Sequence, residues 1–249
     1  MCHNNIEIRE GAFIVADAHY SHLRPLFLDF IKEIYLKRLK PTQIVFMGDI
    51  FDILFYQIPY SQKINQEVIK LINEISKETE IIYLEGNHDF NLTKIFPKIK
   101  VFGLSQQPLA CRFGSKKLLL AHGDFGSVLK YRIYTAVIRN PFTLYFLRFL
   151  DLLSNHMIIK KLDKYLSKKE DCKDFIGFRE FVSKRIASVY ECDYFIEGHF
   201  HQNKTFLFEK FTYINLGAFA CKQRYFVLNS SDNKKILREC SFFGSYGDG

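Results

Sequence analysis

The chain has 249 residues, 48% of them apolar and 25% charged, which is typical of a folded globular protein and sufficient for one α/β domain. Its net charge of +8 is compatible with a solvated basic surface or with an anionic partner such as nucleic acid, a phosphorylated substrate or acidic lipid headgroups. It contains no run of about 18 uninterrupted apolar residues, which argues against a membrane-spanning helix.

Strand and helix patterns alternate through the first half of the chain. Three short apolar runs have the length of buried strands: Ala12–Ala16, Gln43–Met47 and Glu80–Leu84. Between them, residues 24–38 and 62–77 carry apolar side chains at helical spacing. This alternation predicts a largely parallel sheet with helices packed outside it.

The second half begins with a predicted strand at Lys117–Ala121 and then changes pattern. Residues 127–190 are helical in pattern throughout, and a strand at Asp193–Glu197 follows. The remaining strand-like runs are Thr205–Phe208, Tyr213–Leu216, Arg224–Leu228 and Lys235–Arg238. Because no repeat or linker interrupts the sequence, we predict a single domain over residues 1–249, with 127–190 as a helical cap inserted into a β-rich core.

The cysteines show no pattern of a disulfide framework or a metal site. The six lie at positions 2, 111, 172, 192, 221 and 240, without a CxxC pair or regular spacing. The first seven residues are polar and do not form a secretory segment. We therefore expect reduced thiols and a cytoplasmic protein.

Five short motifs, most of them directly after an apolar run, carry the side-chain types that bind metals. They are Asp17-Ala18-His19, Gly48-Asp49, Gly86-Asn87-His88-Asp89, His122-Gly123-Asp124 and Gly198-His199-Phe200-His201. Because strand ends collect at one rim of an α/β sheet, we expect these motifs to form one site. Imidazole, carboxylate and amide ligands together suit divalent transition metals such as Mn²⁺, Fe²⁺ or Zn²⁺. One such motif alone is more often an ordinary capped polar residue, but five in this order make that explanation remote.

The pattern D-x-H, G-D, G-N-H-D, H and G-H-x-H over residues 12–220 resembles the calcineurin-like metallophosphoesterases. The resemblance implies a four-layer α/β/β/α sandwich that holds two divalent metal ions, with Asp49 bridging them. The other ligands would be Asp17, His19 and His201 for the first metal, and Asn87, His122 and His199 for the second.

Such a site would hydrolyse a phosphoester by in-line displacement at phosphorus. Two metals roughly 3.5–4 Å apart share a water, lower its pKa and neutralise charge on the attacked phosphoryl oxygens. We predict His88 as the general acid or phosphoryl-oxygen donor, with Asp89 fixing its orientation. Asp52 and Asp124 are predicted to hold metal ligands in place, with ordinary loop caps as an equal alternative.

A narrower resemblance concerns the substrate. The segments 16–19, 86–90, 122–124, 130–132 and 139–142 look like those of UDP-2,3-diacylglucosamine diphosphatases, enzymes of lipid A biosynthesis. This implies hydrolysis of the pyrophosphate to UMP and 2,3-diacylglucosamine 1-phosphate, usually with Mn²⁺, with Fe or Zn as the alternatives. The substrate contacts implied are Asn87, His88, Tyr131, Arg132, Ser167 and Lys168. In one departure, those enzymes commonly carry Arg where this chain has His88, whereas the broader superfamily carries His.

The helical block is apolar enough to serve a lipid substrate. Residues 144–153 hold more apolar side chains than one amphipathic stripe needs, although Arg148 and Asp151 interrupt them. We expect this cap to house acyl chains and to dock, as a peripheral protein, on the anionic cytoplasmic face of the inner membrane. The residues expected to face phosphates are Arg132, Arg139, Lys160 and Lys161. A plain helical hairpin covering the sheet is the alternative.

Two other functions stay open. A nucleotide or nucleic-acid phosphodiesterase would also suit the positive charge, and it predicts an open basic and aromatic groove instead of a closed apolar chamber. A non-catalytic scaffold would be expected to lose one of Asp17, Asp49, Asn87 or His199, and all four are present. We expect a nucleotide-linked glycolipid as substrate, no obligatory protein partner, and no binding of nucleic acid.

Overall fold

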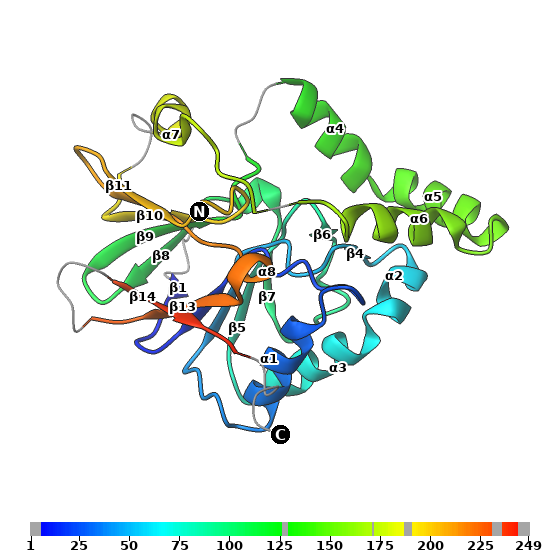
Figure 1. Ribbon diagram of the computed structural model, residues 1–249, viewed down its shortest axis with the longest axis horizontal. Coiled ribbons are helices and arrows are strands. Elements are labelled where there is room, and N and C mark those ends of the chain that lie inside the picture. The colour runs from blue at the N-terminus through cyan, green and yellow to red at the C-terminus, as the bar shows by residue number, and fades with distance from the viewer. Residues whose placement is uncertain (1–5, 126–128, 171, 187–190, 231–235, 244–249) are drawn as a thin grey trace.

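The computed structural model describes residues 6–125, 129–170, 172–186, 191–230 and 236–243, and for 129–132 it describes the backbone alone. Two six-stranded sheets face each other at the centre of the molecule (Figure 1). Helices cover the outer face of each sheet, which gives the four-layer α/β/β/α sandwich predicted from the sequence. The expected α/β fold class is therefore confirmed.

The first sheet contains the strands that alternate with helices along the first half of the chain. In spatial order it consists of β14 (Leu237–Ser241), β13 (Arg224–Leu228), β2 (Phe13–Val15), β3 (Ile44–Phe46), β5 (Ile81–Leu84) and β7 (Lys100–Phe102). β2, β3, β5 and β7 pair in parallel, so the loops after them leave from one edge of the sheet. β13 and β14 add to β2 as an antiparallel hairpin.

The second sheet contains the strands that carry the two later motifs. Its order is β1 (Ile6–Glu7), β8 (Leu109–Phe113), β9 (Lys116–Ala121), β10 (Tyr194–Glu197), β12 (Thr212–Asn215) and β11 (Lys204–Leu207). β9 and β10 are parallel neighbours in which Ala121 pairs with Glu197. The residues that follow these two strands therefore begin side by side, although about 75 residues separate them along the chain.

The space between the sheets is filled by apolar side chains from both. Ile14, Val45 and Ile82 of the first sheet pack with Leu118 and Ile196 of the second, and all are fully buried. Their strand neighbours point to the opposite face, where helices cover them, because successive side chains of a strand alternate. Burial on both faces explains why these strands are continuous apolar runs in the sequence.

The outer helices of the first sheet are α1 (Leu26–Tyr35) and α3 (Gln66–Ile75), which pack against it and each other. The single helix predicted at 62–77 is two helices, because α2 (Pro59–Ile64) ends at Asn65. The Asn65 side chain donates to the carbonyls of Ile53 and Ser61, and this stabilises the break. A two-stranded sheet of β4 (Leu54–Phe55) and β6 (Asp89–Phe90) lies beside α2.

The predicted cap at 127–190 is two separate structures. α4 (Leu129–Arg139), α5 (Pro141–Leu153) and α6 (Met157–Leu166) form an arm that projects beyond β4 and β6 (Figure 1). Residues Leu144 and Ile159 anchor this arm on Phe55 and Phe90. By contrast, α7 (Phe178–Ile186) packs on the outer face of the second sheet and is one layer of the sandwich. The described residues between 167 and 177 form no helix, which corrects the expectation of a continuous helical block.

The expectation that all cysteines are reduced is wrong for two of them. Cys172 and Cys221 form a disulfide, with their Cα atoms 5.6 Å apart. It joins the segment after α6 to α8 (Phe219–Lys222), a short helix that precedes β13. Tertiary contact between segments 49 residues apart brings the thiols together, and their irregular spacing conceals it. Cys111, Cys192 and Cys240 are free thiols.

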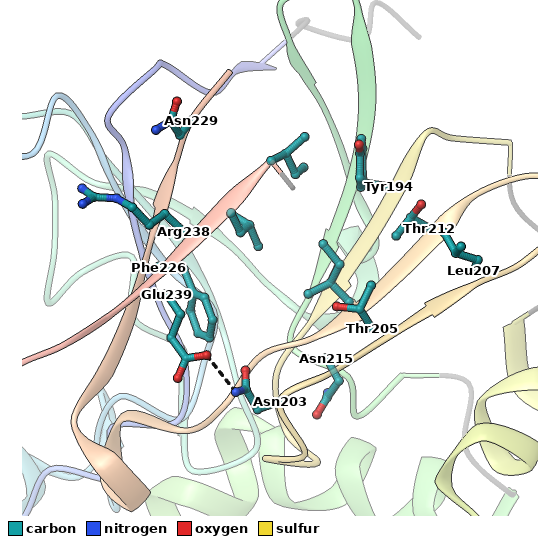
Figure 2. A pocket seen from close by; sticks show the side chains of 13 residues that line it. Tyr194, Asn203, Thr205, Leu207, Thr212, Asn215, Phe226, Asn229, Arg238 and Glu239 are labelled. Atoms are coloured by element: carbon teal, nitrogen blue, oxygen red, sulfur yellow. Dashed lines mark hydrogen bonds between the residues drawn. The ribbon is translucent and has the colours of Figure 1, made fainter. Parts of the chain in front are cut away.

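A cleft of about 770 Å³ lies between the edges of the two sheets, between β11–β12 and β13–β14 (Figure 2). Asn203 donates to Glu239 across one end of it, at 2.9 Å. No metal-binding motif side chain lines this cleft. Within the described residues, no helix is long and apolar enough to cross a membrane.

Candidate metal centre

The five motifs converge where the carboxyl ends of β2, β3 and β5 meet those of β9 and β10. Beyond the paired strands, the first two loops stay hydrogen bonded, since the amide of Asp17 donates to the carbonyl of Gly48 and that of His19 to Asp49. The two sheets thus deliver ligands from opposite sides of one edge. The predicted ligands brought together are Asp17, His19, Asp49, Asn87, His122, His199 and His201.

One group of ligand atoms comes from Asp17, His19 and His201, which lie within 4.8 Å of one another. His201 Nε2 is 3.3 Å from Asp17 Oδ1. His19 Nδ1 donates to Asp52 Oδ1 at 3.1 Å, so its Nε2 carries the free lone pair. That Nε2 is buried and has no hydrogen-bond partner among the described residues. A buried, unpartnered imidazole nitrogen beside a carboxylate is what a metal ligand requires.

The second group comes from Asp49, His122, His199 and Asn87. His122 Nδ1 donates to the carbonyl of Met47 at 2.9 Å, which directs Nε2 at the other ligands. Against the effect of burial, the carboxylate of Asp49 beside it holds the pKa of His122 well above its usual range, so a metal at Nε2 would replace a proton there. This Nε2 lies 3.2 Å from Asn87 Oδ1, 3.2 Å from His199 Nδ1 and 3.4 Å from Asp49 Oδ2. Three ligand atoms, from Asn87, His199 and Asp49, therefore converge on His122 Nε2. A cation satisfies all of them, so the residues fit a second metal.

The backbone at these ligands is strained in a way that supports a built site. Five of the seven have φ in the left-handed region, which non-glycine residues adopt only at a cost. They are Asp17 (51°), His19 (46°), Asp49 (51°), His199 (63°) and His201 (58°). The surrounding hydrogen bonds must compensate this strain, and such strain clusters at functional sites.

Two glycines allow the ligand loops to approach one another. A Cβ on Gly86 would lie 2.1 Å from Asp49 Oδ1, and one on Gly198 would lie 2.5 Å from Asp17 Oδ2. Any side chain at either position would push a ligand carboxylate out of place. The glycines of the G-N-H-D and G-H-x-H motifs are thus required by close packing between loops.

The charges of the site suit metal binding. Burial opposes ionisation of Asp49, but the attraction of His122 outweighs it and holds the pKa of Asp49 well below its usual range. Burial, reinforced by the neighbouring His122, lowers the pKa of His199 to about 3. The Asp49 carboxylate is therefore ionised and the His199 imidazole is neutral, and these are the forms that coordinate a metal.

His88 lies at the mouth of the site, but Asp89 does not orient it. Its Nδ1 donates to the carbonyl of Asp52 at 3.0 Å, and its Nε2 is 4.0 Å from Asp49 Oδ2. Burial lowers the pKa of His88, so the ring is neutral. The expectation that Asp89 fixes its orientation is wrong, because the described contacts of the Asp89 carboxylate are with backbone amides and the Tyr83 hydroxyl and not with His88.

Asp89 instead connects the loop that carries Asp49 to the loop that carries Asn87. Its carboxylate accepts hydrogen bonds from the amides of Asp49, Ile50 and Phe51, from that of Gly86, and from the Tyr83 hydroxyl. Burial, together with the charge of Asp49, raises the pKa of Asp89 to about 7. We infer a structural role, because the carboxylate holds both the Asp49 loop and the Asn87 loop.

The predicted supporting carboxylates differ in what they contact. Asp52 accepts from His19, as expected of a residue that orients a ligand. Asp124 has no hydrogen bond to a metal ligand among the described contacts, and it accepts from Arg139 at 3.2 Å. The expectation that Arg139 faces substrate phosphates is also corrected, because protein groups already surround its guanidinium. Arg139 Nη2 donates to the carbonyl of Gly86 at 2.7 Å.

The predicted substrate contacts are only partly placed. Tyr131 and Arg132 belong to α4, but their side chains lie outside the described residues. Ser167 Oγ donates to the carbonyl of Lys164 at the end of α6, and Lys168 is exposed. Arg24 Nη2 donates to the neighbouring Lys169 carbonyl at 2.7 Å, which places this turn beside the first ligand loop. Their contact with a substrate stays a prediction.

A buried ion pair next to the site was not anticipated. Glu197 is fully buried and accepts from Arg185 of α7 and from the Tyr213 hydroxyl. Arg185 also donates to the carbonyl of Gly123 at 3.0 Å. One signal was available in the sequence, since Glu197 is a lone charge at the end of an apolar strand just before the G-H-x-H motif.

The sequence profile of the calcineurin-like phosphoesterase family matches residues 12–203. This chain belongs to the calcineurin-like phosphoesterase family. It is accordingly a metal-dependent phosphoesterase, and the convergent ligands are its candidate dinuclear centre.

Curated relatives within this phosphoesterase family carry one name. A UDP-2,3-diacylglucosamine hydrolase of Pseudomonas fluorescens is 26% identical over 200 residues, which covers 76% of this chain and 78% of the relative. Its namesake from Aliivibrio fischeri is 23% identical and covers 78% and 83%. Among solved structures, the phosphoesterase Yfce from E. coli aligns with 92% of this chain and 98% of its own, with 12% identity and a TM-score of 0.49.

Proposed function

We propose that this phosphoesterase hydrolyses UDP-2,3-diacylglucosamine to UMP and 2,3-diacylglucosamine 1-phosphate. The observation that carries the proposal is the apolar arm of α4, α5 and α6 that begins next to the metal centre. Metal ligands alone suit any phosphoester, whereas a surface rich in exposed Phe and Leu suits a substrate with acyl chains. The relatives named UDP-2,3-diacylglucosamine hydrolase support the same substrate.

The chain's own residues supply positioning and proton handling. When bound, two divalent ions would provide a nucleophilic hydroxide at neutral pH and neutralise charge on the phosphoryl oxygens. The residues proposed to hold them are Asp17, His19 and His201 on one side, Asn87, His122 and His199 on the other, and Asp49 between them. Asn87 and His88 line the entrance, and we assign His88 Nε2 to donate to a phosphoryl or leaving-group oxygen. The Asp52 carbonyl holds the ring for this task. We propose Mn²⁺ as the metal, with Fe and Zn as alternatives.

We also propose that the arm docks on the anionic cytoplasmic face of the inner membrane. One face of α5 exposes large apolar side chains, among them Phe142 at 84%, Phe146 at 63% and Phe149 at 56%. Arg148 on α5 and Lys160 on α6 add positive charge beside them. Apolar insertion and attraction to acidic headgroups together bind a surface helix to a bilayer. A lipid substrate would then reach the site directly from the bilayer.

Turnover of UDP-2,3-diacylglucosamine, measured as UMP release with Mn²⁺ present, tests this function. We expect release that stops on chelation, returns with added Mn²⁺, and falls by at least about a thousandfold in Asp49→Ala, since the bridging ligand is lost. The mutation Leu207→Ser on β11 is a matched control and should leave the rate unchanged. Hydrolysis of a simple phosphodiester or of single-stranded nucleic acid, with none of the lipid substrate, would contradict the proposal.

A further inference from the structure

Two arginines connect the helices at 129–186 to the loops of the metal centre. Arg139 is the last residue of α4, and Arg185 lies in the last turn of α7. Their side chains are 14% and 9% exposed, so both guanidinium charges are largely removed from water. A buried charge must be compensated by protein groups, and for these two arginines many of those groups belong to the loops of the metal centre.

Arg139 holds the loop that carries Asn87. Its Nη2 donates to the carbonyl of Gly86, the residue before Asn87, at 2.7 Å. The same atom donates to Asp124 at 3.2 Å, and Nη1 lies 3.6 Å from Glu85. The guanidinium also packs 5.0 Å from the centre of the Phe90 ring. One side chain of α4 thus connects the loop after β5 to the loop after β9.

Arg185 holds the two loops that carry His122 and His199. Its Nη1 donates to the carbonyl of Gly123 at 3.0 Å, directly after His122. Its Nη2 is paired with Glu197, two residues before His199. The rings of Phe125 and Phe200 lie 5.0 Å from the guanidinium and enclose it. Among the described residues neither Nε has a hydrogen-bond partner, so the terminal nitrogens make the bonds described above.

The pattern of these contacts is asymmetric. Every loop that the two arginines touch carries a ligand of the second group, made of Asn87, His122 and His199 with the bridging Asp49, although the loop of His199 also carries His201 of the first group. Neither arginine has a described contact with Asp17, His19 or His201. In the first group, His19 is oriented by the buried Asp52.

We propose that Arg139 and Arg185 are positioning residues that make assembly of the second metal site depend on the seating of α4 and α7. This inference rests on the proposed dinuclear centre but not on the identity of the lipid substrate. Residues that orient metal ligands typically contribute 10- to 100-fold to metal affinity. When α4 or α7 is displaced, the second site weakens and the first one stays formed.

Calorimetric titration of the metal-free full-length protein with Mn²⁺ tests the proposal. We expect two sites in the wild type, and in Arg139→Ala or Arg185→Ala a 10- to 100-fold weaker affinity at one site only. His199→Ala and His201→Ala identify which site is which. Electron paramagnetic resonance should show that the spin-coupled Mn²⁺ pair gives way to a single isolated ion at equal metal loading.

Matched controls separate positioning from folding. Arg148→Ala on α5, the helix after α4, and Arg179→Ala on α7 itself remove exposed arginines and should leave both affinities unchanged. If Arg185→Ala does not fold, Arg185→Lys and Arg139→Lys test the same point, because lysine keeps the charge but cannot reproduce two bonds from one fork. We expect these two variants to fall between alanine and wild type.

Equal weakening of both sites, or unchanged affinity at both, would overturn the proposal. Failure of the proposed function is a different result: normal Mn²⁺ binding without turnover of the lipid substrate would leave the arginine assignment intact. A wild-type protein that binds no metal would refute both.

Discussion

At the scale of single residues, the site depends on side chains that other side chains hold. His19 presents Nε2 because Asp52 takes its Nδ1, and His122 presents Nε2 because the Met47 carbonyl takes its other nitrogen. His88 is fixed by the Asp52 carbonyl. A neutral imidazole held there donates one hydrogen bond, where Arg would offer a charged fork.

Asp89→Asn should destabilise the fold, because an amide cannot accept all five hydrogen bonds that the buried carboxylate receives. Its NH₂ group would face backbone N–H donors. We expect a loss of about 3 kcal/mol in unfolding free energy, measured by urea denaturation of metal-free protein. The exposed Glu74→Gln serves as control and should leave the midpoint nearly unchanged. An Asp89→Asn protein as stable as wild type would show that this carboxylate does not hold the loops together.

At the scale of elements, tertiary contacts divided what the sequence pattern joined. The pattern at 62–77 predicts one helix, and the Asn65 side chain makes it two. The pattern at 127–190 predicts one cap, yet α7 buries Phe178 and Val182 on the second sheet and leaves the arm to α4, α5 and α6. Periodicity identifies an apolar face but does not say which surface covers it.

The disulfide should be detectable by alkylation of the native protein. Burial raises the pKa of Cys111 to about 12 and that of Cys192 to about 11, so both stay unreactive thiols near neutral pH. Among the described cysteines, we expect iodoacetamide to label Cys240 first, and Cys172 and Cys221 only after a dithiol reductant is added.

Reduction should also lower thermal stability. The bond closes a segment of 49 residues, for which the chain-entropy estimate is about 4 kcal/mol. The melting temperature of Cys172→Ser should be lower than that of wild type and insensitive to reductant. Labelling of Cys172 and Cys221 without reductant would contradict the pairing.

At the scale of the whole molecule, two faced sheets bring the ends of five strands to one edge and leave the arm beside it (Figure 1). The net charge of +8 is spread over this molecule, and the arm combines several positive side chains with exposed apolar ones. We therefore expect binding to a bilayer to depend on the arm and on ionic strength.

Sedimentation with vesicles of phosphatidylglycerol measures this dependence. The double variant Phe146→Ser/Phe149→Ser should bind at least about tenfold more weakly than wild type, because each buried Phe contributes about 1.5–3 kcal/mol. Leu207→Ser removes an equally exposed apolar side chain from β11, outside the arm, and should bind normally. Raising the salt concentration should weaken wild-type binding. Equal effects of both substitutions, or none, would rule out docking by the arm.

The sequence by itself determined the reaction class and most of the sheet, because strand-end motifs and doubly buried strands depend on local chemistry. Ala12–Ala16, Gln43–Met47 and Glu80–Leu84 contain β2, β3 and β5, since residues buried on both faces must be apolar. Strands of two residues, such as β1, β4 and β6, are too short to show a period.

Only the tertiary structure decided which groups hold the metal ligands. Asp89 binds the amides of the Asp49 loop, Arg139 binds the Gly86 carbonyl and Arg185 the Gly123 carbonyl. These partners lie far away in sequence, and no spacing reveals such contacts. The Cys172–Cys221 pairing is hidden for the same reason. Local motifs in the sequence identify the metal ligands. Their orientation depends on packing between distant segments, which forms only when the two sheets and the helices around them are assembled.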